Sequence, residues 1–149
     1  MFKLLQIEYE EHPLYHRTKA VIESLDERFL QYETDWHNNG AIGLWCSTYP
    51  RMCSGFGPNC YEIKLKPETK RYGMSLEDLK KLSYERSSRE SYSDLRKYCL
   101  DNRFDVLYIK DRWNLVGEVI IVNYDQVESI LLVEPPEDKQ YKLLEVENE

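Results

Sequence analysis

The spacing of apolar residues along the chain predicts strands at both ends and helices in the middle. Residues 119–122 form four consecutive β-branched apolar positions, a pattern typical of a strand that is buried on both faces. Residues 59–65 alternate between apolar and polar side chains, which predicts a half-exposed strand. Looser apolar runs predict further strands at 2–9, 14–18, 41–46, 104–109, 115–122 and 128–133.

Helical spacing predicts three helices. The first covers 19–30, where Thr18 is a candidate N-cap. The second begins after Ser75, which is followed by acidic residues in the first turn. The third covers about 92–100, after a polar interruption at 84–91, and the residues at 67–73 read as a linker.

Strands, then helices, then strands predict an α+β fold with a mostly antiparallel sheet. The 149 residues are enough for one domain with a sizeable core. We assign this domain to 1–133. The acidic C-terminal tail at 134–149 is expected to be an added helix or a mobile segment.

Composition and charge bear on where the protein acts and what it binds. No apolar run reaches the length that spans a membrane, and the charged first eleven residues offer no signal-peptide core. We therefore expect a soluble, cytoplasmic protein without a membrane partner. The net charge of −7 argues against tight non-specific binding of nucleic acid. The basic middle could be a solvated helical face or a surface that docks a target; its cations are Lys80, Lys81, Arg86, Arg89, Arg96 and Lys97.

The four cysteines do not form a metal-binding pattern. Cys46, Cys53, Cys60 and Cys99 contain no Cys-x-x-Cys pair and have no matched histidine spacing, so we expect neither zinc nor another metal. A disulfide framework is not expected without a secretion signal. Buried free thiols are the better interpretation.

A single carboxylate stands at the start of the most apolar strand. Glu118 follows Gly117 and directly precedes the run at 119–122. A partly desolvated carboxylate at this position could hold a fixed negative charge against a developing positive one. The ordinary alternative is a solvated strand end.

Three segments together resemble a known family. They are Leu14-Tyr15-His16-Arg17-Thr18, Gly43-Leu44-Trp45-Cys46-Ser47-Thr48, and Gly117-Glu118-Val119-Ile120-Ile121-Val122 followed by Gln126-Val127. In this order they resemble the ADP-ribosyltransferase superfamily, in its His-Tyr-Glu branch with the poly(ADP-ribose) polymerases. There a first strand carries His or Arg, a second an aromatic residue or a Ser-Thr pair, and a later strand opens with the catalytic Glu. The segment at 103–108 is similar to the family's strand that pairs, as a hairpin, with the strand carrying the catalytic Glu. The resemblance therefore spans about 13–133.

The resemblance implies a fold of split antiparallel β-sheets with helices packed on them, and NAD bound in the cleft between the sheets. It implies that Glu118 binds the 2′-hydroxyl of the nicotinamide ribose. His16 would hydrogen-bond the adenosine ribose, and Ser47 the nicotinamide carboxamide. The remaining residues of the implied NAD site are Arg17 and Thr18 beside His16, Trp45 where the family often has Tyr, Thr48 as a brace for the strand, and Tyr49 or Phe56 stacked on the nicotinamide ring.

Each residue also has a plain structural interpretation. His16 could be a structural histidine, Trp45 a core residue, and Ser47 with Thr48 a strand-end cap. The sequence also departs from the family at two places. Arg17 stands where the family usually has Gly, so its side chain must point away or contact a phosphate. Val116, two residues before Glu118, replaces the acid that the arginine-modifying branch needs, so arginine is not the expected acceptor.

Cleavage of the nicotinamide–ribose bond builds an oxocarbenium-like cation on the sugar, and a fixed carboxylate stabilises that charge without a metal. The resemblance therefore implies an NAD-dependent mono-ADP-ribosyltransferase that modifies a macromolecular acceptor. We expect a protein acceptor, with nucleic acid left open. Such minimal forms resemble bacterial or phage effectors, which would act in a host cytoplasm. The alternatives are an inactive binding module of the same fold and an NAD glycohydrolase that uses water as the acceptor.

Overall fold

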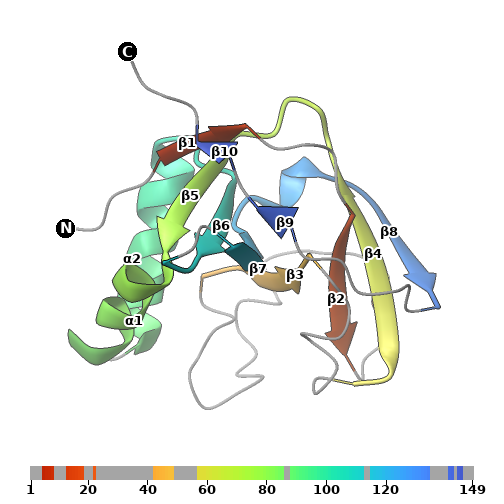
Figure 1. Ribbon diagram of the computed structural model, residues 1–149, viewed down its shortest axis with the longest axis horizontal. Helices are drawn as coiled ribbons and strands as arrows, with labels where there is room; N and C mark the ends of the chain where they lie inside the picture. The colour runs from red at the N-terminus through yellow and green to blue at the C-terminus, as the bar shows by residue number, and fades with distance from the viewer. Residues whose placement is uncertain are drawn as a thin grey trace.

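The computed structural model describes residues 5–8, 13–18, 22, 42–48, 57–85, 88–112, 115–134, 141–142 and 144–145. These residues form an α+β fold, as the sequence predicts, with a large mixed sheet and two α-helices (Figure 1). The strands are β1 (Leu5–Glu8), β2 (Leu14–Thr18), β3 (Leu44–Ser47), β4 (Asn59–Leu65), β5 (Arg71–Ser75), β6 (Val106–Lys110), β7 (Leu115–Ile121), β8 (Val127–Val133), β9 (Tyr141–Lys142) and β10 (Leu144–Glu145). The helices are α1 (Leu76–Glu85) and α2 (Ser88–Asp101), and a 3₁₀ turn covers Tyr124–Gln126.

The strands follow the order β10-β1-β5-β6-β7-β3-β2-β4-β8, and β9 pairs with β7. Among the described strands only β5 and β6 pair in parallel, so the sheet is mostly antiparallel, as predicted. Among the described residues, β2 and β3 pair at one position, Tyr15 with Ser47. Hydrogen bonds therefore trace one sheet rather than two, but its two halves are joined weakly at this point.

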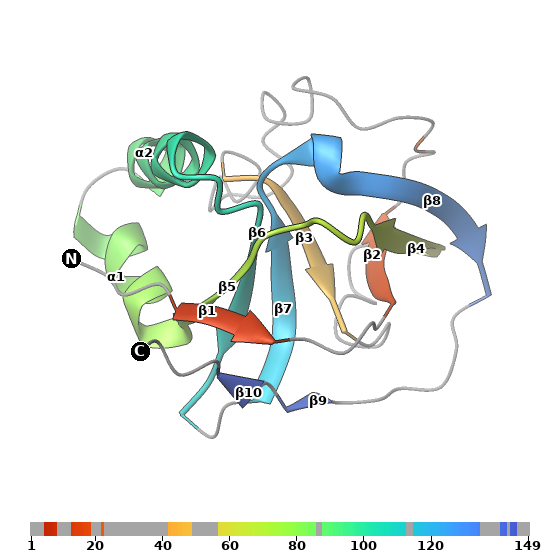
Figure 2. The same cartoon turned by 90° about the horizontal axis from the view of Figure 1, so that it is seen from above.

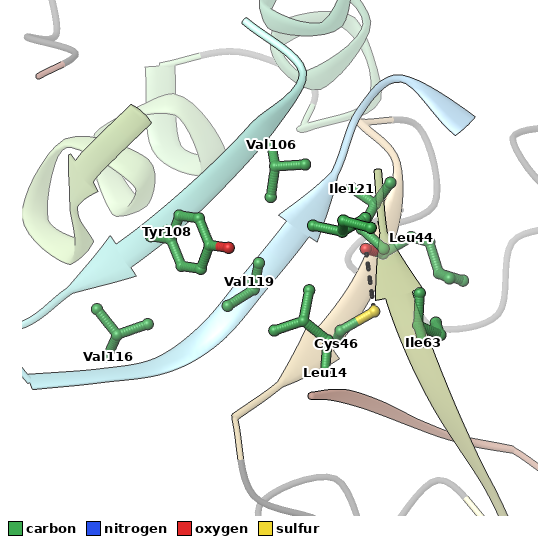
Figure 3. Packing of buried hydrophobic residues seen from close by; sticks show 10 residues of the cluster. Leu14, Leu44, Cys46, Ile63, Val106, Tyr108, Val116, Val119 and Ile121 are labelled. Atoms are coloured by element: carbon green, nitrogen blue, oxygen red, sulfur yellow. Dashed lines mark hydrogen bonds between the residues drawn. The ribbon is translucent and has the colours of Figure 1, made fainter. Parts of the chain in front are cut away.

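The strands from β6 to β4 line one buried cluster. It contains Leu14 of β2, Ile63 of β4, Tyr108 of β6 and Val119 of β7, with Cys46 of β3 between them (Figure 3). Figure 2 shows β4 and β8 running across the direction of β6 and β7, so the sheet is strongly bent between these two pairs of strands.

The other face of the central strands is covered by the helices. Leu79 of α1 and Leu95 of α2 share a second core cluster with Ile120 and Val122. Figure 2 shows both helices on the side of β6 and β7 away from β4 and β8. Residues 119–122 thus supply both clusters alternately, Val119 and Ile121 to one and Ile120 and Val122 to the other. The prediction of a strand buried on both faces is confirmed.

The serine cap predicted for the second helix is also confirmed. The backbone N–H of Asp78 donates to Ser75 Oγ over 3.1 Å, which satisfies one of the free donors in the first turn of α1. The predicted strands at 59–65 and 128–133 and the hairpin of β6 with β7 are confirmed as well.

Several predicted boundaries were wrong. The linker at 67–73 overlaps β5, which begins at Arg71, and the helix predicted from 92 begins at Ser88. Part of the segment predicted as a helix or mobile tail forms the short strands β9 and β10, which pair with β7 and β1. The helix predicted at 19–30 lies outside the described residues, apart from Ile22.

The basic residues of the middle do not all form a solvated face. Lys80, Lys81 and Lys97 are exposed, but Arg96 donates from α2 to the carbonyls of Ile42 and Val122. Its guanidinium also lies over the ring of Tyr124, 5.3 Å from the centroid. Arg96 therefore ties α2 to the chain on either side of the central strands. Neither described helix combines the length and apolar character that crossing a bilayer requires.

Candidate functional site

The three segments singled out in the sequence lie on adjacent strands. β7, β3 and β2 are neighbours in the sheet. Ser47 is the register partner of Glu118 on one side and of Tyr15 on the other. Because directly paired residues point to the same face of a sheet, these three side chains form a row across three strands. Chain segments about a hundred residues apart thus meet at one place.

The position of Glu118 is set by an irregularity in β7. Ile109 of β6 pairs with Glu118, whereas the next residue, Lys110, pairs with Val116. Gly117 is therefore an extra residue in β7, which makes a β-bulge. Bulges change the direction in which the following side chain points and are common beside functional sites.

Thr48 fixes the bulged segment from the neighbouring strand. Its backbone N–H donates to the carbonyl of Gly117 over 3.0 Å, and its Oγ1 donates to the carbonyl of Val116 over 2.9 Å. The side chain of Thr48 is only 2% exposed, so water does not compete for these bonds. Thr48 thus holds the backbone directly before Glu118.

The carboxylate of Glu118 is in a partly desolvated environment. Burial raises the pKa of Glu118 above its ordinary value, and the positive charge of Lys80 on α1 partly offsets this rise. Ser47, which is 1% exposed, and the apolar Ile109 are its neighbours across the sheet. Lys80 itself is exposed on α1. Glu118 thus lies beside the apolar Ile109, and the cation that affects its pKa is Lys80.

His16 contacts the backbone of β3 rather than its side chains. Its Nδ1 lies 2.7 Å from the carbonyl oxygen of Trp45. A carbonyl can only accept, so Nδ1 carries the proton. Burial lowers the pKa of His16, and the Trp45 carbonyl partly offsets this. The neutral ring then presents Nε2 as an acceptor, and within the described part of the chain this atom has no hydrogen-bond partner.

The hydrogen bond of His16 follows from the weak junction of the sheet. In the part of the chain that the structure describes, β2 and β3 pair only at Tyr15 with Ser47, so the imidazole satisfies a carbonyl that further pairing toward Trp45 would have used. Side chains alternate along a strand, which places Tyr15 on the face of Ser47 and His16 on the opposite face. A ligand that touches both Glu118 and His16 must therefore cross the β2–β3 junction.

Trp45 belongs in part to the core. It packs against the helix-side cluster, and its ring centroid lies 6.4 Å from that of Tyr92 on α2. It is only half-buried and shares the face of Ser47, because it stands two residues earlier on the same strand. The structure thus gives Trp45 a packing role beside the candidate site.

Arg17 and Thr18 end β2 next to His16. The Nε of Arg17 donates to the carbonyl of Gly57 over 3.1 Å, so the guanidinium points toward the chain before β4. Thr18 pairs with Asn59. Tyr49 and Phe56, the two candidates for stacking on the nicotinamide, lie outside the described residues.

Two neighbours of Glu118 and Ser47 were missed in the sequence. Tyr15, 8% exposed, stands in the row with both of them, and Lys80 acts on Glu118 from α1. The sequence could have indicated Tyr15, since it directly precedes His16 on a predicted strand and must face the other way. It could not have indicated Lys80, because the proximity of Lys80 to Glu118 depends on how α1 packs on the sheet.

Within the described residues, the thiols and the potential metal ligands form no second site. Cys46, Cys60 and Cys99 are buried and free, as predicted for these cysteines. In the described ranges, His, Cys, Asp and Glu side chains do not gather in groups of three or more that could hold a metal ion. Comparisons of the chain with protein-family models, curated proteins and solved structures found no match.

Proposed function

We propose that the protein is an NAD-dependent mono-ADP-ribosyltransferase that cleaves the nicotinamide–ribose bond and passes ADP-ribose to a protein acceptor. The observation that carries this proposal is the pairing of Ser47 with Glu118 on one side and with the His16-bearing strand on the other. The family resemblance requires these three segments to surround one ligand. Their adjacency in the sheet supports that requirement for Ser47 and Glu118, which share one face, whereas His16 lies on the opposite face and would reach the same ligand only across the β2–β3 junction.

The fold is part of the same proposal. We propose that the single, strongly bent sheet, with helices covering one face of β6 and β7, corresponds to the split-sheet arrangement that the resemblance implies. NAD would lie across the β2–β3 junction. There the neutral Nε2 of His16 would accept a hydrogen bond from a hydroxyl of the adenosine ribose.

Glu118 supplies the chemistry. As the bond to nicotinamide breaks, positive charge develops on the ribose. A carboxylate held in place by a braced backbone stabilises that charge without reorganising, and a preorganised group of this kind contributes on the order of 2.7–4 kcal/mol. Lys80 favours the ionised form of Glu118, which this role requires. The hydroxyl of Ser47 would orient the leaving nicotinamide.

Val116 bears on which acceptor the proposed enzyme would modify. Val116 is apolar and fully buried, so the acid that would recognise an arginine acceptor is missing from that position. The proposal is for transfer of one ADP-ribose unit rather than a polymer. A cytoplasmic acceptor, in the producing cell or in a host, is consistent with this proposal.

The test is release of nicotinamide from NAD, measured by chromatography in the presence of a cell extract that supplies acceptors. We expect Glu118→Gln to lower the rate by about 10²–10³-fold and His16→Ala to weaken the apparent affinity for NAD. Glu128→Gln, a carboxylate on β8 that pairs with Lys64, is the matched control and should keep the parent rate.

The outcomes separate the alternatives. Labelled ADP-ribose on a macromolecule supports the transferase, whereas free ADP-ribose at the same rate without extract indicates a glycohydrolase. NAD binding without nicotinamide release, unchanged by Glu118→Gln, indicates a binding module and refutes the enzyme. Loss of activity in Glu128→Gln would show that the carboxylate effect is not specific to Glu118.

A further inference from the structure

Among the described strands, β8 pairs with a neighbour along one edge alone. β8 is the last strand in the sheet order, and it forms the margin of the molecule on the side away from the helices (Figures 1 and 2). β4 pairs with one edge of β8. Among the described strands none pairs with its other edge, so a row of backbone N–H and C=O groups is available there.

The side chains of β8 make this edge unusually apolar. Leu131 is 58% exposed and Leu132 is 65% exposed. Because they are neighbours on a strand, they point to opposite faces, so one strand added alongside would shield both. The stretch from Ser129 to Val133 carries no charge. Natural edge strands are usually protected by charges, prolines or bulges. In β8 the bulge at Glu128 and the following Glu134-Pro135-Pro136 stand at the two ends, and the stretch from Ser129 to Val133 between them carries none of these protections.

We propose that β8 pairs antiparallel with β8 of a second copy of this chain, around a two-fold axis at Ile130. The two sheets would then join into one continuous sheet. In this register Ser129 faces Leu131 of the second copy and Ile130 faces its own counterpart. Glu128 is the extra residue of a bulge in β8, because Lys64 pairs with Ser129 and Leu65 with Val127, so the regular pairing ends at Ser129. No like charges oppose each other, and Glu128 keeps its ion pair with Lys64 of its own chain, 3.6 Å away.

The uncharged side chains of β8 favour pairing with a second copy of this chain over pairing with a foreign peptide. Peptides that add to a sheet edge are selected by side-chain pockets or by charge. The outer part of β8 offers uncharged apolar side chains, which match the same uncharged strand in an isologous contact. The net charge of −7 on each copy opposes association at long range. The dimer should therefore strengthen when salt screens that repulsion.

The interface is independent of the candidate site. β4 separates β8 from β2, and none of the paired residues belongs to the row of Tyr15, Ser47 and Glu118. Failure of the dimer would therefore leave the proposed function standing, and failure of the function would leave the dimer standing.

The experiment is sedimentation of the full chain over a concentration series at low and high salt. We expect a concentration-dependent dimer in the parent protein. Leu131→Lys should raise its dissociation constant at least about tenfold, because each dimer would bury two unpaired charges. Leu100→Lys is the matched control, since Leu100 is an exposed leucine on α2, and it should sediment like the parent.

The register is tested by a cross-link. In the double variant Ser129→Cys with Leu131→Cys, each new thiol faces its counterpart across the two-fold axis. Directly opposed residues of antiparallel strands have Cα atoms about 4.5–5.5 Å apart, within reach of a disulfide. Oxidation should give a covalent dimer that mass spectrometry assigns to 129 and 131. A parent that is monomeric throughout, a dimer unaffected by Leu131→Lys, or a double variant that does not cross-link would overturn the proposal.

Discussion

Thr48 offers the sharpest test of how the candidate site is held. Its hydroxyl donates to the carbonyl of Val116, and its backbone N–H donates to the carbonyl of Gly117. Thr48→Val keeps the shape of the side chain and the backbone bond but removes the hydroxyl. The buried carbonyl of Val116 then loses a partner, two residues before Glu118.

The magnitude follows from burial. Thr48 is 2% exposed and Val116 is fully buried, so water does not replace the missing donor. Leaving one buried acceptor unsatisfied costs about 1–3 kcal/mol. For a chain of this size, each 1 kcal/mol lowers the melting temperature by about 2–4 °C. The looser backbone should also displace Glu118, and a misplacement of about 1 Å can cost on the order of 100-fold in rate.

Thr69→Val is the matched control. The hydroxyl of Thr69 donates to the carbonyl of Lys66 over 2.6 Å, and Thr69 is 6% exposed. It lies in the turn between β4 and β5, so its loss should cost similar stability without affecting nicotinamide release. Thermal unfolding and the nicotinamide assay would be run on both variants. If Thr48→Val and Thr69→Val lose stability and activity to the same extent, Thr48 has no particular role in positioning Glu118.

Three further predictions address the fold and the acid. An added Cβ at Gly43 would lie 2.3 Å from the carbonyl oxygen of Ile121, so Gly43→Ala should cost about 1–3 kcal/mol in urea unfolding; an unchanged midpoint would contradict the close approach of β3 to β7. Ser75→Ala removes the cap that accepts from Asp78 and should cost about 1 kcal/mol, and a melting temperature equal to that of the parent would show that the cap is dispensable. Since burial raises the pKa of Glu118 in the folded state, ionisation of this group costs stability as the pH rises through that pKa. Glu118→Gln should therefore be more stable than the parent at neutral pH, with the difference shrinking below the ordinary pKa of 4.5; a difference that does not vary with pH would refute this cause.

Local sequence patterns predicted the strands whose own residues alternate between apolar and polar or are uniformly apolar. The segment predicted from the alternation at 59–65 has the same bounds as β4. The run at 119–122 lies between two core clusters because all four of its side chains are apolar. β5 was missed because it contains Gly73 and no apolar alternation. It is a strand because β6 pairs with it in parallel. The two-residue strands β9 and β10 are too short to show any pattern.

The candidate site could be predicted only in part, because it depends on pairings between distant segments. Residue types and their order pointed to His16, Ser47 and Glu118, but no local pattern places β3 between β7 and β2. The bulge at Gly117 and the bond from His16 to the Trp45 carbonyl arise from that placement. The effect of Lys80 on Glu118 likewise depends on how α1 packs.

The central claim is that these three strands hold one NAD molecule, and a crystal structure of the Glu118→Gln variant with NAD tests it most directly. We predict that the side chain at 118 lies within hydrogen-bond distance of the 2′-hydroxyl of the nicotinamide ribose, about 3 Å. Nε2 of His16 should contact the adenosine ribose across the β2–β3 junction. NAD bound elsewhere on the molecule, or bound at this junction with position 118 out of reach of the ribose, would contradict the account.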